Sequence, residues 1–269
     1  MDTFDLFSMK GKNVLITGGR QMYGLGATLA LADAGANLYV ASHSIESAQA
    51  FVDQLREEKG VKVQAVAFDQ NDIGSIERMV ETVVADAGSL DCFVHCSRIL
   101  PRSNKPGGGW DGGDDAMESN VHTNSAASLY LLQLVGEQMI RQKQGSIVVF
   151  GSMMGLIGVE KHNYDGNPNM VGGAYGHTYS VDKSGLTAWV RHAASYYGQY
   201  GVRINAVCPG GLQSDRTNPV FAQEYSKHTQ VGRLATQDDI KGPILLLASD
   251  AGAYLTGLSI PVDGGYTCL

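Results

Sequence analysis

The sequence predicts an α/β fold, a doubly wound parallel sheet of about seven strands with helices on both faces. Short, almost wholly apolar runs alternate with longer helical patterns along the 269 residues. Apolar runs without polar alternation are typical of parallel strands that are buried on both faces. Hydrophobic residues make up 43% of the chain and charged residues 17%, which suits a globular protein and argues against disorder.

Each strand is expected where an apolar run is bounded by polar or glycine-containing segments. The runs lie at 13–17, 37–41, 61–68, 91–95, 145–150, 202–207 and 259–262. Helices are expected up to residue 34, over 45–59 and over 73–87, because each of these patterns stops at a glycine (Gly35, Gly60 and Gly88). The sequence shows no internal repeat and no linker, so we expect one domain over residues 1–269.

Three segments interrupt the alternation of strands and helices: 101–115, 153–174 and 212–232. In a doubly wound sheet, ligands bind at the carboxyl ends of the strands. Long connections in compact domains often carry function. We therefore expect these segments to be substrate loops at that edge.

Charge and cysteine content restrict the classes of partner. Twenty basic and 27 acidic residues give a net charge of −7, which argues against nucleic acid or a membrane as a main partner. The first 12 residues contain no long apolar run, so no secretory signal is expected. Cys92, Cys96, Cys208 and Cys268 show neither zinc-ligand spacing nor a disulfide pattern, which predicts no metal site and a cytoplasmic protein.

A glycine-rich turn, Thr17-Gly18-Gly19-Arg20-Gln21-Met22-Tyr23-Gly24-Leu25-Gly26, joins the first strand to the first helix. Glycine allows a sharp turn and a close approach of backbone to a pyrophosphate. The N-terminus of the helix then offers free N–H groups and the positive end of its dipole. The alternative is an ordinary turn, but its place between strand and helix favours a Rossmann-type dinucleotide site.

The end of the second strand bears on the choice of cofactor. A carboxylate there would bind the ribose 2′-hydroxyl and repel a 2′-phosphate, but the sequence reads Ala41-Ser42-His43-Ser44. Arg20 and His43 together are suited to a 2′-phosphate. We therefore expect NADP(H) rather than NAD(H), although NAD(H) is possible and His43 is also typical of a solvated loop.

The segment Tyr179-Ser180-Val181-Asp182-Lys183 lies in a predicted helix. Residues four apart share a helix face, so the Tyr179 hydroxyl and the Lys183 ammonium can approach the same point. A cation near a phenol stabilises the phenolate, which suits the tyrosine to general acid–base work. The alternative is a surface tyrosine with a solvated lysine. Ser152, which follows a strand at the same sheet edge, favours the catalytic interpretation.

These motifs resemble the classical short-chain dehydrogenase/reductase family from about Lys10 to Gly265. The resemblance implies a catalytic tetrad of Asn124, Ser152, Tyr179 and Lys183. Tyr179 would then donate the proton, Ser152 would polarise the carbonyl, Lys183 would bind the nicotinamide ribose, and Asn124 would hold a water. Asn120 competes with Asn124, but Asn124 lies 28 positions before Ser152, and this spacing favours Asn124.

The same resemblance implies further cofactor contacts and a dimer or tetramer. The remaining cofactor residues it implies are Asp69, Gln70, Cys96, Ser97, Pro209, Gly210, Leu212 and Ser214. Tyr179 and Lys183 also belong to this set. The aromatic stretch 189–200 suits a subunit contact, although a helix facing its own sheet would look alike.

Three features depart from the family pattern. The turn holds two extra residues, and the usual Asn-Asn-Ala-Gly after the fourth strand reads His95-Cys96-Ser97-Arg98. An arginine in place of that glycine must either leave the crevice or line it. The third departure is an insertion at 156–173, which carries Lys161, His162, Tyr164 and Asp165. It is expected to recognise a polar substrate or, alternatively, to be a surface excursion or subunit contact.

The function expected from the sequence is an NADP(H)-dependent oxidoreductase that interconverts a ketone and a secondary alcohol. The alternatives are a 3-oxoacyl-thioester reductase and a dinucleotide-binding protein without turnover. An enoyl reductase of the same superfamily would place its tyrosine seven positions before the lysine, where this chain has Gly176.

Overall fold

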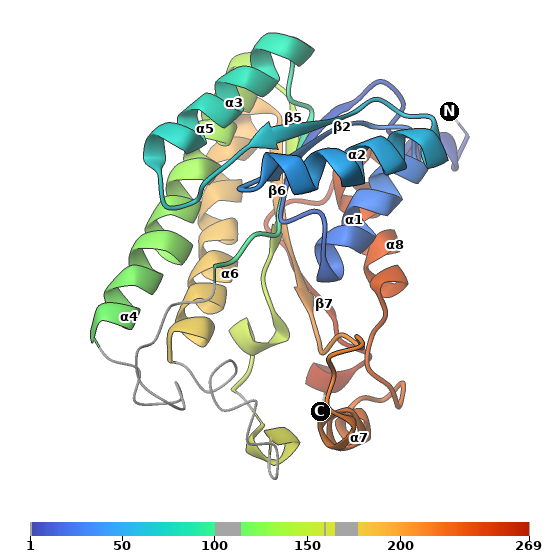
Figure 1. Cartoon of the computed structure of the whole chain (residues 1–269), viewed down its shortest axis with the longest axis vertical. Coiled ribbons are helices and arrows are strands. Elements are labelled where there is room, and N and C mark those ends of the chain that lie inside the picture. Colours follow the sequence, from blue (N-terminus) through green and yellow to red (C-terminus); the bar gives the residue numbers. More distant parts are fainter. Residues whose placement is uncertain (1, 100–113, 159, 165–176, 269) are drawn as a thin grey trace.

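The chain forms a single seven-stranded sheet, described by a computed structural model for residues 2–99, 114–158, 160–164 and 177–268. All strand pairs are parallel, in the order β3-β2-β1-β4-β5-β6-β7 (Figure 1). The strands are β1 (Asn13–Thr17), β2 (Asn37–Ser42), β3 (Val63–Ala67), β4 (Cys92–His95), β5 (Gly145–Phe150), β6 (Val202–Pro209) and β7 (Ser259–Val262). The predicted fold class and strand number are confirmed. The third strand is shorter than expected and the sixth is longer.

Eight α-helices belong to the described part of the chain. They are α1 (Met22–Asp33), α2 (Ile45–Lys59), α3 (Ile73–Ala87), α4 (Asp114–Asn120), α5 (Ala127–Gln142), α6 (His177–Tyr197), α7 (Pro219–His228) and α8 (Lys241–Ala248). The predicted bounds of α2 and α3 are confirmed. The expected loop over 101–115 is wrong at its end, since α4 already begins at Asp114, while 101–113 lie outside the described residues. The segment 212–232 contains α7.

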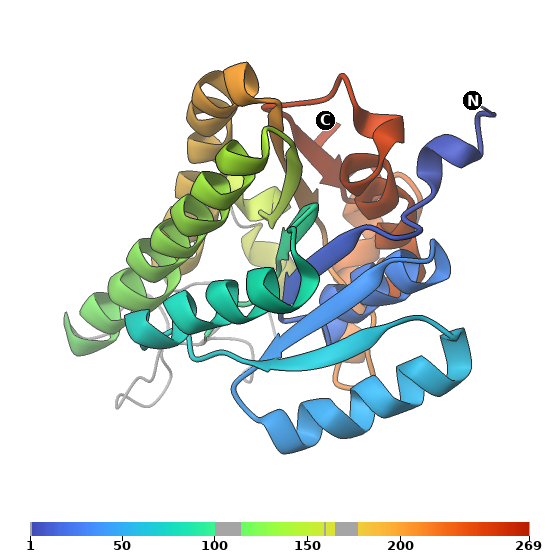
Figure 2. The same cartoon turned by 90° about the horizontal axis from the view of Figure 1, so that it is seen from above.

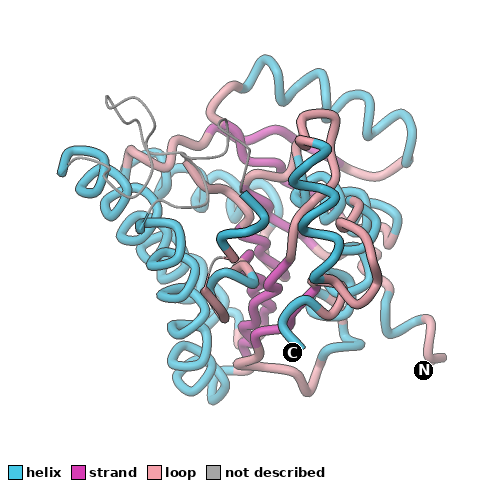
Figure 3. The backbone as a smooth tube through the Cα atoms, turned by 90° about the horizontal axis from the view of Figure 1, so that it is seen from below, coloured by secondary structure: helices cyan, strands magenta, loops and turns pink. Residues whose placement is uncertain are grey.

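The sheet separates two hydrophobic cores, because successive side chains of a strand point to opposite faces. Leu15 of β1 packs with α3, α5 and α6, whereas Val14 and Ile16 pack with α1, α2 and α8. Figures 2 and 3 show the strands between these two helix layers. No helix in the described ranges is long and apolar enough to cross a membrane.

The strand order contains one reversal, at which β1 pairs with both β2 and β4. The chain runs outward from β1 to β3 and then returns to β4 on the other side. The connections after β1 and β4 therefore diverge, and this is the place where open α/β sheets bind ligands.

His95 at the end of β4 is a buried polar residue that bridges two elements. Its Nδ1 lies 3.0 Å from Thr17 Oγ1 of β1, and its Nε2 lies 3.0 Å from Ser128 Oγ of α5. Burial, with a smaller contribution from Lys183, lowers the pKa of His95 to about 3, so the ring is neutral. Within the described residues no cluster of three or more histidine, cysteine or acidic side chains is placed to hold a metal.

Replacement of His95 by the family's asparagine should make the protein more resistant to acid. The folded state keeps His95 neutral down to about pH 3, whereas the unfolded chain binds its proton near pH 6.5, so this group costs stability as the pH falls between these values. Between pH 7 and pH 5 the wild type should lose about 1–2 kcal/mol more unfolding free energy than His95→Asn. Urea unfolding at both pH values measures this difference. His192→Asn, at an exposed histidine of α6, is the control and should behave as the wild type.

Candidate active site

Two adjoining clefts open at the carboxyl ends of the strands. The first has a volume of about 540 Å³ and lies at the ends of β1 to β4, where Gly18, Ser42 and Asp69 are among its lining residues. The second has a volume of about 440 Å³ and is lined by residues that follow β5 and β6 and by α6 and α7. Met22, Cys96 and Arg98 line both clefts. Of the two possibilities predicted for Arg98, that it leaves the crevice or that it lines it, the structure shows the second.

The glycine-rich turn packs tightly against the residues after β4. Gly18 has a φ of +69°, and a Cβ there would lie 2.8 Å from the backbone nitrogen of Ser97, so only glycine fits without strain. The lengthened turn enters α1 through two residues with non-helical backbone. Gln21 is extended, and Met22, the first residue of α1, has a left-handed φ of 52°. Gly26 packs against the carbonyl of Gln237, where a Cβ would not fit.

The first turn of α1 is suited to an anion. Its N-cap residue, Gln21, makes no side-chain capping bond, and no acidic residue lies in the first turn. Amides at a helix N-terminus that are not capped by a side chain are available to a phosphate.

Arg20 belongs to the turn after β1, and its side chain reaches the end of β2, where the cofactor prediction places it. Its two terminal nitrogens each donate at 3.0 Å, one to Ser42 Oγ and one to Ser47 Oγ. His43 Nε2 lies 3.7 Å from Asp69 Oδ2 at the exposed rim of the same cleft. The structure therefore brings together the predicted group of Arg20, Ser42, His43 and Asp69.

Gln70 and Ser97 line the first cleft with polar groups that are already bonded. Ser97 Oγ donates to Gln70 Oε1 at 2.6 Å, and Gln70 Nε2 donates to the Thr123 carbonyl at 2.8 Å. These two residues join the ends of β3 and β4 to the helical segment around Thr123. Their side chains shape the wall of the cleft.

Tyr179, Lys183 and Ser152 all line the second cleft. Lys183 is buried on α6, and its Nζ donates to the Phe150 carbonyl at 2.6 Å. Burial lowers the pKa of Lys183 to about 8, and the positive charge of Arg98 acts in the same direction. Ser152 Oγ accepts a hydrogen bond from the Met154 amide at 3.1 Å, which leaves its proton available to another acceptor.

Asn124 lies behind these residues in a π-helical segment, Val121–Ala126, between α4 and α5. Its Oδ1 accepts from the Ile99 amide at 2.9 Å and its Nδ2 donates to the Ile99 carbonyl at 2.7 Å. It does not line either cleft. Asn120, the competing residue, accepts from Asn124 Nδ2 and donates to both oxygens of Asp182 at 2.9 Å. Single π-turns inside helices are frequently found at functional sites.

The second cleft has an aromatic side, of which the sequence analysis named Tyr164 but missed Phe221 and Tyr225. Tyr164 and Phe221 have ring centroids 5.3 Å apart, and Phe221 and Tyr225 are 5.4 Å apart. Phe221 and Tyr225 belong to α7, where their spacing of four places them on one helix face. That spacing was the available signal.

The insertion contributes to the cleft only in part. Of its four predicted recognition residues, Tyr164 lines the cleft, whereas the His162 side chain is 75% exposed and is bonded to Glu160. Asp165 and the side chain of Lys161 lie outside the described residues.

The other predicted cofactor residues divide into two groups. Pro209, Gly210 and Leu212 line the second cleft. Gly24, Leu25, Gly26 and Ser214 do not line either cleft. The Ser214 amide and hydroxyl bond to Thr217 Oγ1 at 2.8 and 3.1 Å, so that serine stabilises the turn before α7.

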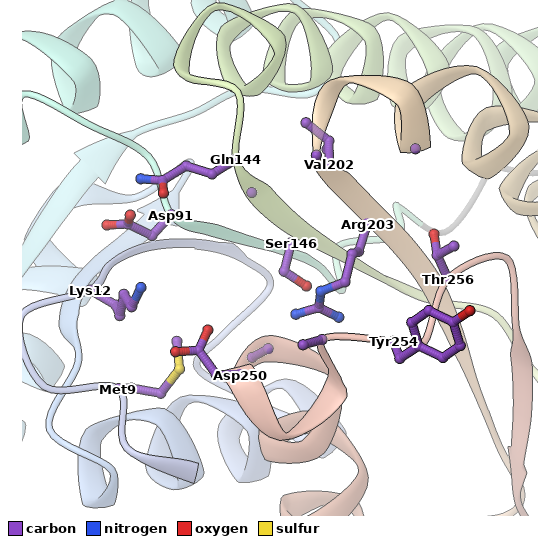
Figure 4. A pocket seen from close by; sticks show the side chains of 15 residues that line it. Met9, Lys12, Asp91, Gln144, Ser146, Val202, Arg203, Asp250, Tyr254 and Thr256 are labelled. Carbon is purple, nitrogen blue, oxygen red and sulfur yellow. The ribbon is translucent and has the colours of Figure 1, made fainter. Parts of the chain in front are cut away.

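A third cavity of about 580 Å³ lies at the opposite edge of the sheet, where β1, β4, β5 and β6 begin (Figure 4). Its arginine, Arg203, donates to the carbonyls of Leu247 and Ser249, and Ser146 also donates to Leu247. These bonds tie α8 to the sheet. The predicted catalytic residues are absent from the lining of this larger cavity. We therefore interpret its polar residues as contacts that hold α8 against the sheet and not as a catalytic site.

Comparison with known proteins agrees with this geometry. A family model described as "Enoyl-(Acyl carrier protein) reductase" matches residues 22–267. An NADP-dependent mannitol dehydrogenase from Hypocrea jecorina is 30% identical, and the match covers 98% of this chain and 95% of the relative. A 3-oxoacyl-[acyl-carrier-protein] reductase from Staphylococcus aureus is 29% identical, over 94% of this chain and 97% of the relative.

The same architecture occurs in solved structures. The crystal structure of an NADPH-dependent 3-quinuclidinone reductase from Rhodotorula rubra has a TM-score of 0.84 and 25% identity, covering 100% of this chain and 96% of that one. The family model spans most of the chain, and these relatives match the chain almost from end to end. The chain therefore belongs to the short-chain dehydrogenase/reductase family.

Proposed function

We propose that this protein is an NADP(H)-dependent oxidoreductase that interconverts a ketone and a secondary alcohol. The observation that carries the proposal is the meeting of Ser152, Tyr179 and Lys183 in one cleft that adjoins a second cleft suited to a dinucleotide. The mannitol dehydrogenase and the quinuclidinone reductase support this reaction class.

The residues of the first cleft fit NADP(H). The uncapped N-terminus of α1 is suited to the pyrophosphate, and Arg20, between Ser42 and Ser47, is suited to the 2′-phosphate. Gly18 lets the turn pack closely against the backbone of Cys96 and Ser97, and all three residues line the cleft. When bound, the nicotinamide supplies or accepts the hydride.

In the proposed mechanism, Tyr179 is the general acid that donates its hydroxyl proton to the substrate oxygen during reduction. The same group accepts the proton during oxidation. Lys183 lies one helical turn away, and its ammonium stabilises the phenolate form of Tyr179. The Ser152 hydroxyl donates to the substrate oxygen and polarises the carbonyl. We assign Asn124 to hold the π-helical segment that supports a proton-relay water.

Two alternatives follow from specific observations. The Staphylococcus aureus relative favours a 3-oxoacyl-thioester reductase, which the same tetrad serves. A binding protein without turnover is favoured by the extended turn, but it gives no role to Tyr179 and Ser152. The description of the matching family model names an enoyl reductase, but the spacing of Tyr179 and Lys183 argues against that activity.

We further propose a cytoplasmic homo-oligomer, and its support comes from the family. The aromatic stretch 189–200 adds little, because Tyr197 is buried in the protein's own core and Trp189 and Tyr200 pack against that core. Tyr196 alone among these four is more than half exposed. Light scattering on purified protein distinguishes a dimer or tetramer from a monomer.

Tyr179→Phe should abolish turnover while leaving cofactor binding intact. Loss of a positioned general acid typically costs about 10²–10⁴-fold in rate. NADPH oxidation is followed with ketones, ketoses, quinones and 3-oxoacyl thioesters as substrates, and NADPH affinity is measured by titration. Tyr196→Phe, on the exposed face of the same helix, is the matched control and should retain full activity. Unchanged turnover by Tyr179→Phe would falsify the proposed mechanism, and turnover of thioesters alone would favour the first alternative.

Arg20→Ala should weaken NADPH binding by about 10–100-fold, which corresponds to one lost charge-assisted contact. Affinity for NADH should change less than threefold, because NADH has no 2′-phosphate. Equal losses for both cofactors would show that Arg20 stabilises the turn rather than reading the phosphate.

A further inference from the structure

The side chain of Arg98 lies against the ring of Tyr179. Its guanidinium carbon is 4.8 Å from the ring centroid, and the side chain is only 14% exposed. Arginine over an aromatic face is attracted by the ring's negative face, and the attraction grows when the pair is shielded from water. The arginine therefore contacts the ring that carries the proposed acid–base hydroxyl.

A buried carboxylate and an amide hold Arg98 in this place. Arg98 Nη2 lies 3.5 Å from Asp182 Oδ2 and 3.4 Å from Asn120 Oδ1. The Asp182 side chain is 2% exposed and also accepts bonds from Asn120 Nδ2 and, at 2.8 Å, from Ser125 Oγ. Asp182 is thus fixed by neutral donors on the α4–α5 side of the site, and its charge faces the guanidinium.

These contacts join residues from separate parts of the chain. Arg98 follows β4, Asn120 and Ser125 lie at the π-helical segment, and Asp182 lies between Tyr179 and Lys183 on α6. Within the described residues, Arg98 Nε is buried without a hydrogen-bond partner. A buried guanidinium with incomplete bonding is costly, and such a cost is often found at functional sites.

We propose that Arg98 is a positioning residue for Tyr179. Its guanidinium holds the face of the Tyr179 ring and stabilises the phenolate form, and the negative charge of Asp182 partly offsets the positive charge of Arg98. The proposal rests on the proposed function only in giving Tyr179 the acid–base role. A positive charge over the ring favours the phenolate, because its negative charge is delocalised into the ring. Asp182 opposes this effect, so the two side chains act on Tyr179 with opposite sign.

Several other titratable groups face this site, and the test must separate them. Lys183 lies on the same helix, Cys96 follows β4, and Tyr23, Tyr164 and Tyr225 line the cleft from α1, the insertion and α7. Of these, Lys183 has the lowered pKa of about 8. Its contribution must therefore be removed in one arm of the experiment.

The experiment is an ultraviolet difference titration of the full-length protein, which does not need a substrate. The absorbance change of a matched protein that also carries Tyr179→Phe is subtracted from that of each variant. The signals of the other 11 of the 12 tyrosines then cancel, and the ionisation curve of Tyr179 remains. Arg98→Met should move the midpoint of this curve up by about one pH unit, the effect expected when a nearby opposite charge is lost. Asp182→Asn should move it down. Repetition in a Lys183→Met background excludes an indirect effect through Lys183.

Two further variants complete the design. Arg98→Lys keeps the positive charge but loses the planar group that lies over the ring, so the midpoint should fall between those of the wild type and Arg98→Met. Arg78→Met, at an exposed arginine of α3 that pairs with Asp72, is the control and should not move it. Circular dichroism shows whether each variant is folded. If Asp182→Asn does not fold, the comparison of Arg98→Met with Arg98→Lys decides.

A midpoint that does not move in Arg98→Met overturns the proposal. So does a variant that mainly weakens NADPH binding with an unchanged titration, since Arg98 would then serve the first cleft. Because the titration does not depend on turnover, absence of activity in the wild type would count against the proposed function and not against this inference.

Discussion

The parallel arrangement of the sheet is the constraint on which the rest of the structure depends. A strand covered by helices on both faces has no access to water, so its backbone groups must bond to neighbouring strands. Seven strands paired in one direction satisfy this need, and each connection must then cross a face of the sheet. As a result, all seven carboxyl ends lie at one edge. The reversal between β1 and β4 opens that edge, and the glycine-rich turn, the Ser152 segment and α6 converge there.

The site at this edge contains several charged side chains that are shielded from water, and burial of a charge costs desolvation free energy. Lys183 and Arg98 bring two positive groups into largely buried positions, and the buried carboxylate of Asp182 pairs with Arg98. The Phe150 carbonyl and the Asn120 amide supply the polar contacts that make such burial tolerable. His95 shows the opposite solution, because a ring bonded to two hydroxyl groups stays neutral and adds no further charge to the centre of the sheet.

Most of the fold followed from local patterns in the sequence. Apolar runs and glycine stops predicted the sheet, and the bounds of α2 and α3, because these signals reflect burial and helix termination within a few residues. The spacing of Tyr179 and Lys183 also placed both side chains at the second cleft. What local patterns did not predict were long-range contacts, such as the pairing of Arg98 with Asp182 and the aromatic face of α7. Arg98 was recognised as unusual, but only the fold shows which ring it meets. Gly26 and Ser214 are predicted cofactor residues, and local patterns did not predict that Gly26 packs against Gln237 or that Ser214 bonds to Thr217.

The sharing of Met22, Cys96 and Arg98 between the two clefts has a kinetic consequence. A molecule that fills the first cleft contacts the same three side chains that line the second, so the order in which two ligands bind is constrained. If the larger ligand occupies the first cleft before the smaller one enters the second, the larger one also leaves last. Its dissociation is then a step of every turnover.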